Sequence, residues 1–229
     1  MNKVQIQYFS DVMCVWAYIA QARLDELQAQ YKSRVSVSYH FVSVYGNTQK
    51  RVVEKWAERG GIPAYIKFVR GVANEFGHVD ISENFWRDGI GPYSSAAVHL
   101  FLKAAAKVCN VVNSAALASN KTLYEELIWQ CRKRYFSEGL NIGLLQNQLQ
   151  IATDLGLDAK DIRAVIEDGS AYAELCEDNE LKDTYHIEGS PTYVLNEGRQ
   201  KLYGNVGYKI IAANVEELLN RPEGVASWC

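Results

Sequence analysis

The chain has 229 residues, of which 48% are hydrophobic and 22% charged, an ordinary composition for a globular protein. Its net charge of −3 argues against a nucleic-acid partner or an anionic membrane surface. No apolar run approaches the roughly 20 residues that span a bilayer, and the first residues lack the apolar segment of a secretory signal. If Met1 is the native start, we expect a cytoplasmic protein whose five cysteines are reduced.

The first 45 residues follow the order strand, helix, strand. Apolar and polar residues alternate over residues 3–9 and again over 34–44, as in half-buried strands. Between them, apolar residues recur every three or four positions from Cys14 to Tyr31, which predicts an amphipathic helix. This order is typical of a parallel βαβ unit.

The middle of the chain is predicted to be helical. Pro63 suits a first helical turn, an apolar stripe runs from Ile62 to Phe76, and Gly77 can end the helix. Further helices are expected over residues 94–109, 120–136, 142–155, 159–168 and 171–184.

The end of the chain returns to strands. The runs PTYVLN and RQKLYG flank Glu197-Gly198, a hairpin signal, and an amphipathic pattern over residues 207–220 predicts a last helix. The two ends can therefore complete one sheet, with the helices between them as an insertion.

Cys14 stands where the first strand runs into the first helix. The positive end of a helix dipole and the unpaired amides of the first turn favour a thiolate, so we expect the pKa of this thiol to lie below its free value. The alternative is a buried, inert cysteine, which is the common state of a free cysteine. The position favours a reactive thiol, because ligands of α/β folds bind where strands end and helices begin.

The segment Gly189-Ser190-Pro191 precedes the predicted hairpin. Proline cannot donate to a sheet ladder, so Pro191 marks a strand entry or an edge. A cis Ser190–Pro191 bond would be a specific feature of such a turn, whereas spacing alone favours an ordinary trans proline.

Two segments resemble the DsbA-like branch of the thioredoxin superfamily. SDVMCVWAYIAQARL is similar to the active-site segment of cytoplasmic FrnE-type oxidoreductases, SDVxCPWCYIGxxxL, and GSPTYVLNEGRQKLYG is similar to the family's cis-proline turn and terminal hairpin. The resemblance implies an α/β fold with a thioredoxin-like sheet and an inserted helical domain. Residues 1–45 and 185–229 would form a discontinuous thioredoxin-like domain, and residues 46–184 the helical insertion. 

The chain departs from the family at the second cysteine. Where the family has Cys-Pro-Trp-Cys, this chain has Cys14-Val15-Trp16-Ala17. Ala17 cannot resolve a mixed disulfide on Cys14, so an external thiol must do so, and glutathione is the abundant thiol of a cytoplasm. The resemblance therefore implies a monothiol enzyme that uses glutathione as a cosubstrate and holds no permanent cofactor.

Relatives that bind glutathione suggest where it would lie. Kappa-class glutathione transferases and 2-hydroxychromene-2-carboxylate isomerases share this architecture and usually carry serine at the position of Cys14. By analogy, the Ser190 backbone beside Pro191 would pair with the glutathione backbone. The loop Gly204-Asn205-Val206-Gly207, before the last helix, would lie near the γ-glutamyl end. A homodimer would fit these relatives.

Other candidate residues carry less weight. Asp11 is expected to cap the helix or to bond locally rather than face the sulfur, and Trp16 suits either the rim of the site or the core. Cys109, Cys131 and Cys176 are expected to be structural, whereas Cys229 could be exposed. The loop between helices contains a cluster of aromatic and apolar residues, Phe85, Trp86, Ile90 and Tyr93. We expect them to pack inward; the alternative is that they line an apolar substrate cleft above the thiol. The four histidines show no paired ligand spacing, so we predict no metal site.

These observations predict a cytoplasmic thiol-disulfide oxidoreductase of the DsbA family with Cys14 as its nucleophile. The first alternative is a glutathione-dependent transferase or isomerase that acts on a small apolar or aromatic electrophile. The second is a thioredoxin-fold protein that binds a partner without turnover.

Overall fold

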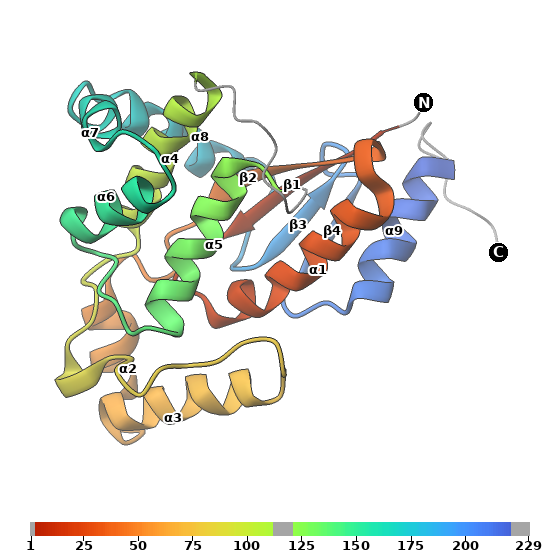
Figure 1. Cartoon of the computed structure of the whole chain (residues 1–229). Coiled ribbons are helices and arrows are strands. Elements are labelled where there is room, and N and C mark those ends of the chain that lie inside the picture. Colours follow the sequence, from red (N-terminus) through yellow and green to blue (C-terminus); the bar gives the residue numbers. More distant parts are fainter. Residues whose placement is uncertain (1–2, 112–120, 221–229) are drawn as a thin grey trace.

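The computed structural model describes residues 3–111 and 121–220 (Figure 1). Four strands form one sheet in the order β2-β1-β3-β4. Strand β1 (Val4–Ser10) pairs in parallel with β2 (Val35–Phe41), in the register Val4↔Val35 to Ser10↔Phe41, and helix α1 (Val15–Tyr31) connects them. The expected βαβ unit is therefore confirmed.

The C-terminal hairpin completes the same sheet. Strand β3 (Thr192–Leu195) runs antiparallel to β1, from Ile6↔Leu195 to Phe9↔Thr192, and β4 (Gln200–Tyr203) forms the edge. The N-terminal strand β1 and the C-terminal strand β3 thus lie side by side, as the sequence predicted.

Helices separate the two halves of the sheet in sequence. Within the described residues they are the π-helical turn η2 (Gln49–Glu54), α2 (Lys55–Ala57), α3 (Gly61–Asn74), the 3-10 turn η3 (Arg87–Gly89), α4 (Ala96–Val111), α5 (Leu123–Phe136), α6 (Leu145–Asp154), α7 (Ala159–Glu167) and α8 (Ser170–Thr184). A short 3-10 turn, η1 (Lys32–Arg34), precedes β2, and α9 (Tyr208–Asn220) follows the hairpin. None of the described helices is long and apolar enough to cross a bilayer.

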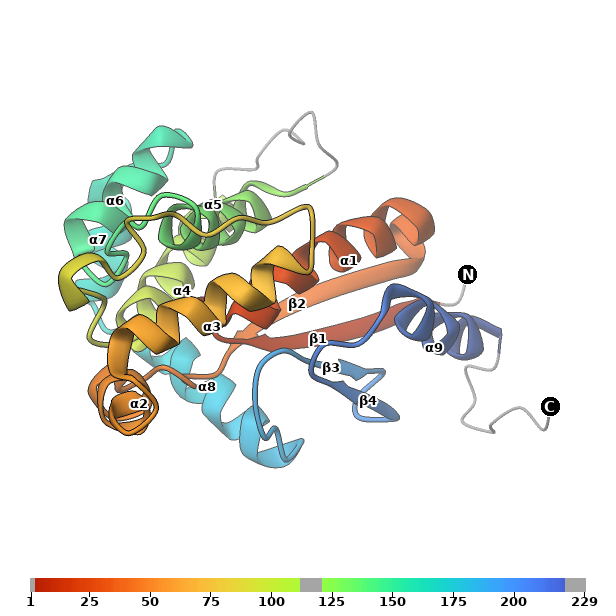
Figure 2. The same ribbon diagram turned by 90° about the horizontal axis from the view of Figure 1, so that it is seen from below.

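The alternating side chains of β1 divide the core between the two faces of the sheet. Val4, Ile6 and Tyr8 are fully buried in the large core that α1 and α9 share (Figures 1 and 2). Phe9 points to the opposite face, where it packs with Val194 and with the end of α8. Helix α8 is the last helix of the predicted insertion, so the insertion itself covers the part of the second face around Phe9, while Gln5 on that face stays exposed. The domain boundaries at residues 46 and 184 stay a prediction.

A buried carboxylate joins α8 to this sheet and to α4. Asp178 of α8 is 1% exposed and accepts hydrogen bonds from the Phe41 amide at 2.7 Å and from Lys103 Nζ at 2.7 Å. His40 Nδ1 lies 2.8 Å from the same carboxylate. The charges of Asp178 and Lys103 depend on each other, because neither side chain is open to water.

We expect Asp178→Ala to lower the free energy of unfolding by about 3–5 kcal/mol, because it leaves Lys103 buried without its counter-charge. Chemical denaturation followed by circular dichroism measures this loss. Glu177→Ala, at an exposed neighbouring position of α8, is the control and should change stability by less than about 0.5 kcal/mol. Equal losses in the two variants would contradict the role given to Asp178.

Candidate functional site

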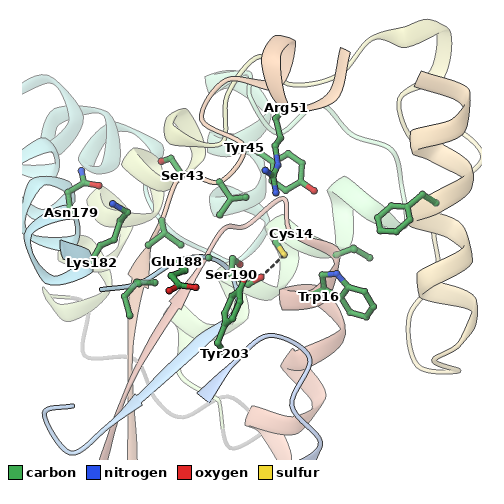
Figure 3. Close-up of a pocket in the computed structure, with 16 residues that line it drawn as sticks. Cys14, Trp16, Ser43, Tyr45, Arg51, Asn179, Lys182, Glu188, Ser190 and Tyr203 are labelled. Atoms are coloured by element: carbon green, nitrogen blue, oxygen red, sulfur yellow. Dashed lines mark hydrogen bonds between the residues drawn. The ribbon is translucent and has the colours of Figure 1, made fainter. Parts of the chain in front are cut away.

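Cys14 is the N-terminal cap of α1, directly after the turn that follows β1. Its backbone is extended (φ −84°, ψ 118°), and its carbonyl accepts the amides of Ala17 and Tyr18 at 3.0 Å each. The side chain is 5% exposed. Its sulfur lies at the floor of a cavity of about 670 Å³ (Figure 3). The junction between strand and helix therefore places the thiol where the sequence predicted, but deeper in the protein.

Burial raises the pKa of the Cys14 thiol above its ordinary value. Hydrogen bonds with the Ser190 side chain and with the backbone amides of Ala17 and Trp16 lower the pKa in part, and the charge of Asp11 raises it further. The prediction of a lowered pKa is therefore wrong. The helix N-terminus does act on the sulfur through its amides, but the loss of water around a buried thiolate outweighs it.

The turn at Ser190 faces the sulfur from the other end of the chain. The Ser190–Pro191 peptide bond is cis, in agreement with the expectation from the motif. Cys14 Sγ donates to the Ser190 carbonyl at 3.3 Å, and Ser190 Oγ accepts the Asp11 amide at 2.8 Å. Two segments 176 residues apart thus meet where the Cys14 side chain contacts the Ser190 backbone, and the thiol is held in a donor role.

Asp11 organises the loops around the thiol instead of capping α1. Its carboxylate, fully buried, accepts the Met13 amide at 2.8 Å, the Tyr45 amide at 2.7 Å and the Ser95 hydroxyl at 2.7 Å. The bond to Met13 is the local hydrogen bond that the sequence allowed, whereas Cys14 has no side-chain cap. Asp11 thereby ties the start of α1 to the loop after β2 and to the start of α4.

Several walls enclose the cavity above the sulfur (Figure 3). The loop after β2 supplies Ser43 and Tyr45, and η2 supplies Arg51. Helix α8 supplies Asn179 and Lys182. The remaining polar lining comes from the segment before β3 and from the edge strand, through Glu188, Ser190 and Tyr203. These polar groups share the lining with apolar side chains such as Val42 and Phe68, and the charged groups are two cations and one carboxylate.

The predicted site residues divide into two groups. Trp16 and Ser190 line the cavity with Cys14, and Trp16 also packs edge-to-face on Phe76 with ring centroids 6.4 Å apart. Pro191 is buried beneath the turn, and its carbonyl accepts the Gly204 amide at 2.8 Å. Gly204, Asn205 and Gly207 are outside the cavity lining, so any ligand contact there stays a prediction.

Sequence reasoning missed several polar and charged side chains that line the cavity. Tyr45 and Arg51 follow a parallel strand whose carboxyl end lies beside that of β1, and this position was the available signal. The sequence contains no comparable signal for Asn179 and Lys182, because a lysine on a helix is ordinarily a solvated residue. Only the packing of α8 against the sheet brings them to the site.

The loop aromatics do not lie above the thiol. Phe85 and Trp86 are buried, and Trp86 Nε1 donates to the Tyr135 hydroxyl at 2.8 Å. Ile90 and Tyr93 are 70% and 89% exposed. None of the four lines the cavity at Cys14. Phe85 and Trp86 pack inward and also line a second cavity, beside α3.

The other cysteines of the described chain lie away from the cavity. Cys109 and Cys131 are buried in the core, as predicted. Cys176 is exposed on α8, so its expected structural role is wrong. Cys229 lies outside the described residues. Among the described residues, no group of histidines, cysteines and carboxylates could hold a metal ion.

A family model of the DSBA-like thioredoxin domain matches residues 84–216, more than half of the chain. The chain belongs to this family. The match covers most of the helical region and the terminal hairpin, and it begins after Cys14. No curated protein matches the sequence.

Solved structures with the same fold agree with this family. A Nitrosomonas europaea protein, provisionally assigned as a protein disulfide isomerase, superposes with a TM-score of 0.75 at 14% identity over 96% of this chain and 99% of its own. The cytosolic disulfide reductase DsbM from Pseudomonas aeruginosa has a TM-score of 0.62 at 17% identity over 96% and 97%. A 2-hydroxychromene-2-carboxylate isomerase has a TM-score of 0.61 at 16% identity over 97% and 100%. At these identities the structures show the shared fold.

We expect iodoacetamide to alkylate Cys14 more slowly than Cys176 at neutral pH, because the raised pKa of Cys14 leaves less thiolate and Cys176 is exposed. The Cys14 rate should keep rising as the pH passes above 9.0, the ordinary thiol value, since the anion forms only there. Peptide mass spectrometry after timed alkylation measures both cysteines in one sample. A Cys14 rate that is already at its plateau at pH 7 would overturn the raised pKa.

Proposed function

We propose that the protein is a cytoplasmic monothiol thiol-disulfide oxidoreductase that uses Cys14 and glutathione. The observation that carries the proposal is the position of the Cys14 sulfur, 3.3 Å from the Ser190 carbonyl at the floor of an open cavity. A disulfide that enters this cavity meets one sulfur and a backbone group beside it. The family of the chain, whose match begins after Cys14, supports thiol-disulfide chemistry for the protein in general.

The single thiol decides what the site can do. Ala17 is buried one turn along α1 at the position of a resolving cysteine, and its amide bonds to the Cys14 carbonyl. No other cysteine of the described chain lines the cavity. The second half of an exchange therefore needs a thiol from solution.

The exchange consists of two displacements at sulfur. The Cys14 thiolate attacks one sulfur of a disulfide, forms a mixed disulfide, and releases a thiolate that takes up a proton. A glutathione thiolate then attacks the sulfur of the bound half, forms a new disulfide with it, and returns Cys14 as a thiolate. Cys14 is unchanged over the cycle, and one disulfide is converted to another. Because burial raises the pKa of Cys14, the first step should accelerate with pH.

The composition of the cavity supports glutathione as the external thiol. Glutathione carries two carboxylates and one ammonium group, and the cavity carries Arg51, Lys182 and Glu188. The DsbM structure with the same fold was determined with GSH. We extend that ligand to this chain as part of the proposal.

A specific observation favours a second candidate, a glutathione-dependent isomerase or transferase. Cys14 donates a hydrogen bond, and burial keeps it protonated. A neutral donor at this position could hold a glutathione thiolate in place without forming a covalent bond. The similarity to the 2-hydroxychromene-2-carboxylate isomerase structure agrees with that role.

We expect wild-type protein incubated with oxidised glutathione to gain one glutathione on Cys14, and free glutathione to remove it. Intact-mass spectrometry, followed by peptide mapping, measures the adduct. Cys14→Ser should gain none at this site, while Cys176→Ser should keep the Cys14 adduct at the wild-type level, because Cys176 lies outside the cavity. Absence of a Cys14 adduct even at alkaline pH would rule out the monothiol exchange. Isomerase or transferase activity that survives in Cys14→Ser would then favour the second candidate.

We expect Ala17→Cys to form an internal disulfide with Cys14 and to raise glutathione-independent disulfide exchange at least about tenfold, because an intramolecular thiol acts at high effective concentration. Residues three apart in a helix are neighbours, which permits the bond. Non-reducing mass spectrometry and an insulin-reduction assay measure the two effects. Ala17→Ser is the matched control and should show neither. Failure of Ala17→Cys to form the bond would move the isomerase or transferase to first place.

A further inference from the structure

The two cations of the cavity come from elements other than the segment that carries Ser190. The whole chain has a net charge of −3, yet the cavity is lined by two cations and by Glu188 as its one carboxylate. The guanidinium of Arg51 lies over the Tyr45 ring, 5.8 Å from its centroid, on the side of the cavity that faces Cys14 (Figure 3). No carboxylate within the described residues forms an ion pair with Arg51. This cation is therefore available to a ligand in the cavity.

Ser43 adds a directed hydrogen-bond donor to the same wall. The Val12 amide donates to His99 Nε2 at 3.2 Å, so Nε2 is an acceptor and the ring proton lies on Nδ1. His99 Nδ1 lies 3.3 Å from Ser43 Oγ and donates to it. His99 is fully buried and stacked on Phe41, which fixes its direction. The Ser43 oxygen is thus occupied as an acceptor, and no described residue accepts the hydroxyl proton.

Helix α8 completes the wall with Asn179 and Lys182. Lys182 Nζ lies 3.0 Å from Asp183 Oδ1, but the side chain of Asp183 is 79% exposed. An exposed pair of this kind contributes little energy, so Lys182 can turn to a ligand at small cost. Glu188 faces this wall from the segment before β3 (Figure 3). The arrangement matches an acid that carries more carboxylates than ammonium groups.

We propose that Arg51, Ser43 and Lys182 form a carboxylate-binding subsite, which makes the protein selective for acidic thiols and their disulfides. Arg51 and Lys182 provide the charge, and Ser43 provides a hydrogen bond whose direction His99 sets. The proposal rests on the proposed function for the identity of the reacting group, but the subsite itself requires no reaction at Cys14.

Symmetrical disulfides of different charge test the selectivity. The probes are dithiodipropionate, an anion, and hydroxyethyl disulfide, which is neutral. The measured quantity is the ratio of their rates of mixed-disulfide formation on Cys14, followed at low ionic strength by peptide mass spectrometry, which distinguishes Cys14 from the exposed Cys176. Arg51→Ala should lower this ratio by about tenfold, the effect of one charge-assisted hydrogen bond. Added salt should lower the ratio in wild type more than in Arg51→Ala.

Matched variants distinguish a specific subsite from non-specific electrostatic attraction by nearby positive charges. Lys50→Ala removes the same charge from the neighbouring residue of η2, which is exposed and outside the cavity lining, and should leave the ratio within about twofold of wild type. Ser43→Ala should lower the ratio without a change of charge, and Ser43→Thr, which keeps the hydroxyl, should restore most of it. Equal effects of Arg51→Ala and Lys50→Ala would overturn the subsite. Equal effects of Ser43→Ala on both disulfides would overturn the role of Ser43.

A binding measurement keeps the subsite testable if exchange is absent. S-methylglutathione has the carboxylates of glutathione but no free thiol, so its affinity is independent of reaction at Cys14. Calorimetry should show affinity weakened about tenfold by Arg51→Ala and unchanged by Lys50→Ala. Loss of exchange with both disulfides, together with retained Arg51-dependent binding, would refute the proposed function and support the subsite. Equal binding to wild type and Arg51→Ala would refute the subsite alone.

Discussion

The carboxylate of Asp11 holds together the segments from which the site is made. It is fully buried and accepts three hydrogen bonds, from the turn before α1, from the loop after β2 and from the start of α4. Three elements that are distant in sequence are thereby fixed around one charged group. Such a charge is stable in the interior only while its donors remain in place. The geometry of the cavity is therefore coupled to the folding of the sheet and of the helical region.

The same carboxylate helps to explain the chemical state of the thiol. Its negative charge lies close enough to Cys14 to disfavour a second anion, and burial disfavours it more strongly. The amides at the start of α1 work in the opposite direction with a smaller effect. A helix N-terminus predicts an activated thiol only when water or a cation also reaches the sulfur, and at this junction the loops tied by Asp11 exclude most of the water.

The parts of the fold that could be predicted are those that produce local sequence patterns. Alternation identified β1 and β2, and the hairpin signal at Glu197-Gly198 identified β3 and β4. The resemblance of two short motifs then brought Cys14 and Ser190 together. These features depend on residues that are adjacent in sequence or lie within one short motif, so a single sequence contains them.

The remaining features of the site depend on contacts between segments that are distant in sequence, and a single sequence does not specify these contacts. The burial of Cys14 follows from how the loop after β2 and the segment before β3 close over it, and Lys182 reaches the cavity only because α8 packs on the sheet. The exposure of Cys176 also depends on which face of α8 is covered. Hydrophobic periodicity was a poor guide here, because α8 has little segregation of polar from apolar residues.

The burial of Cys14 also affects how readily oxidants damage its thiol. Peroxides attack thiolates, and the resulting sulfenic acid is ordinarily rescued by a neighbouring thiol before it is oxidised irreversibly. Ala17 removes that neighbour, so an exposed and ionised sulfur at this position would have no internal rescue. A thiol that is protonated and 5% exposed reacts slowly with such oxidants. Burial therefore protects the one sulfur at this site from damage that the chain cannot itself reverse.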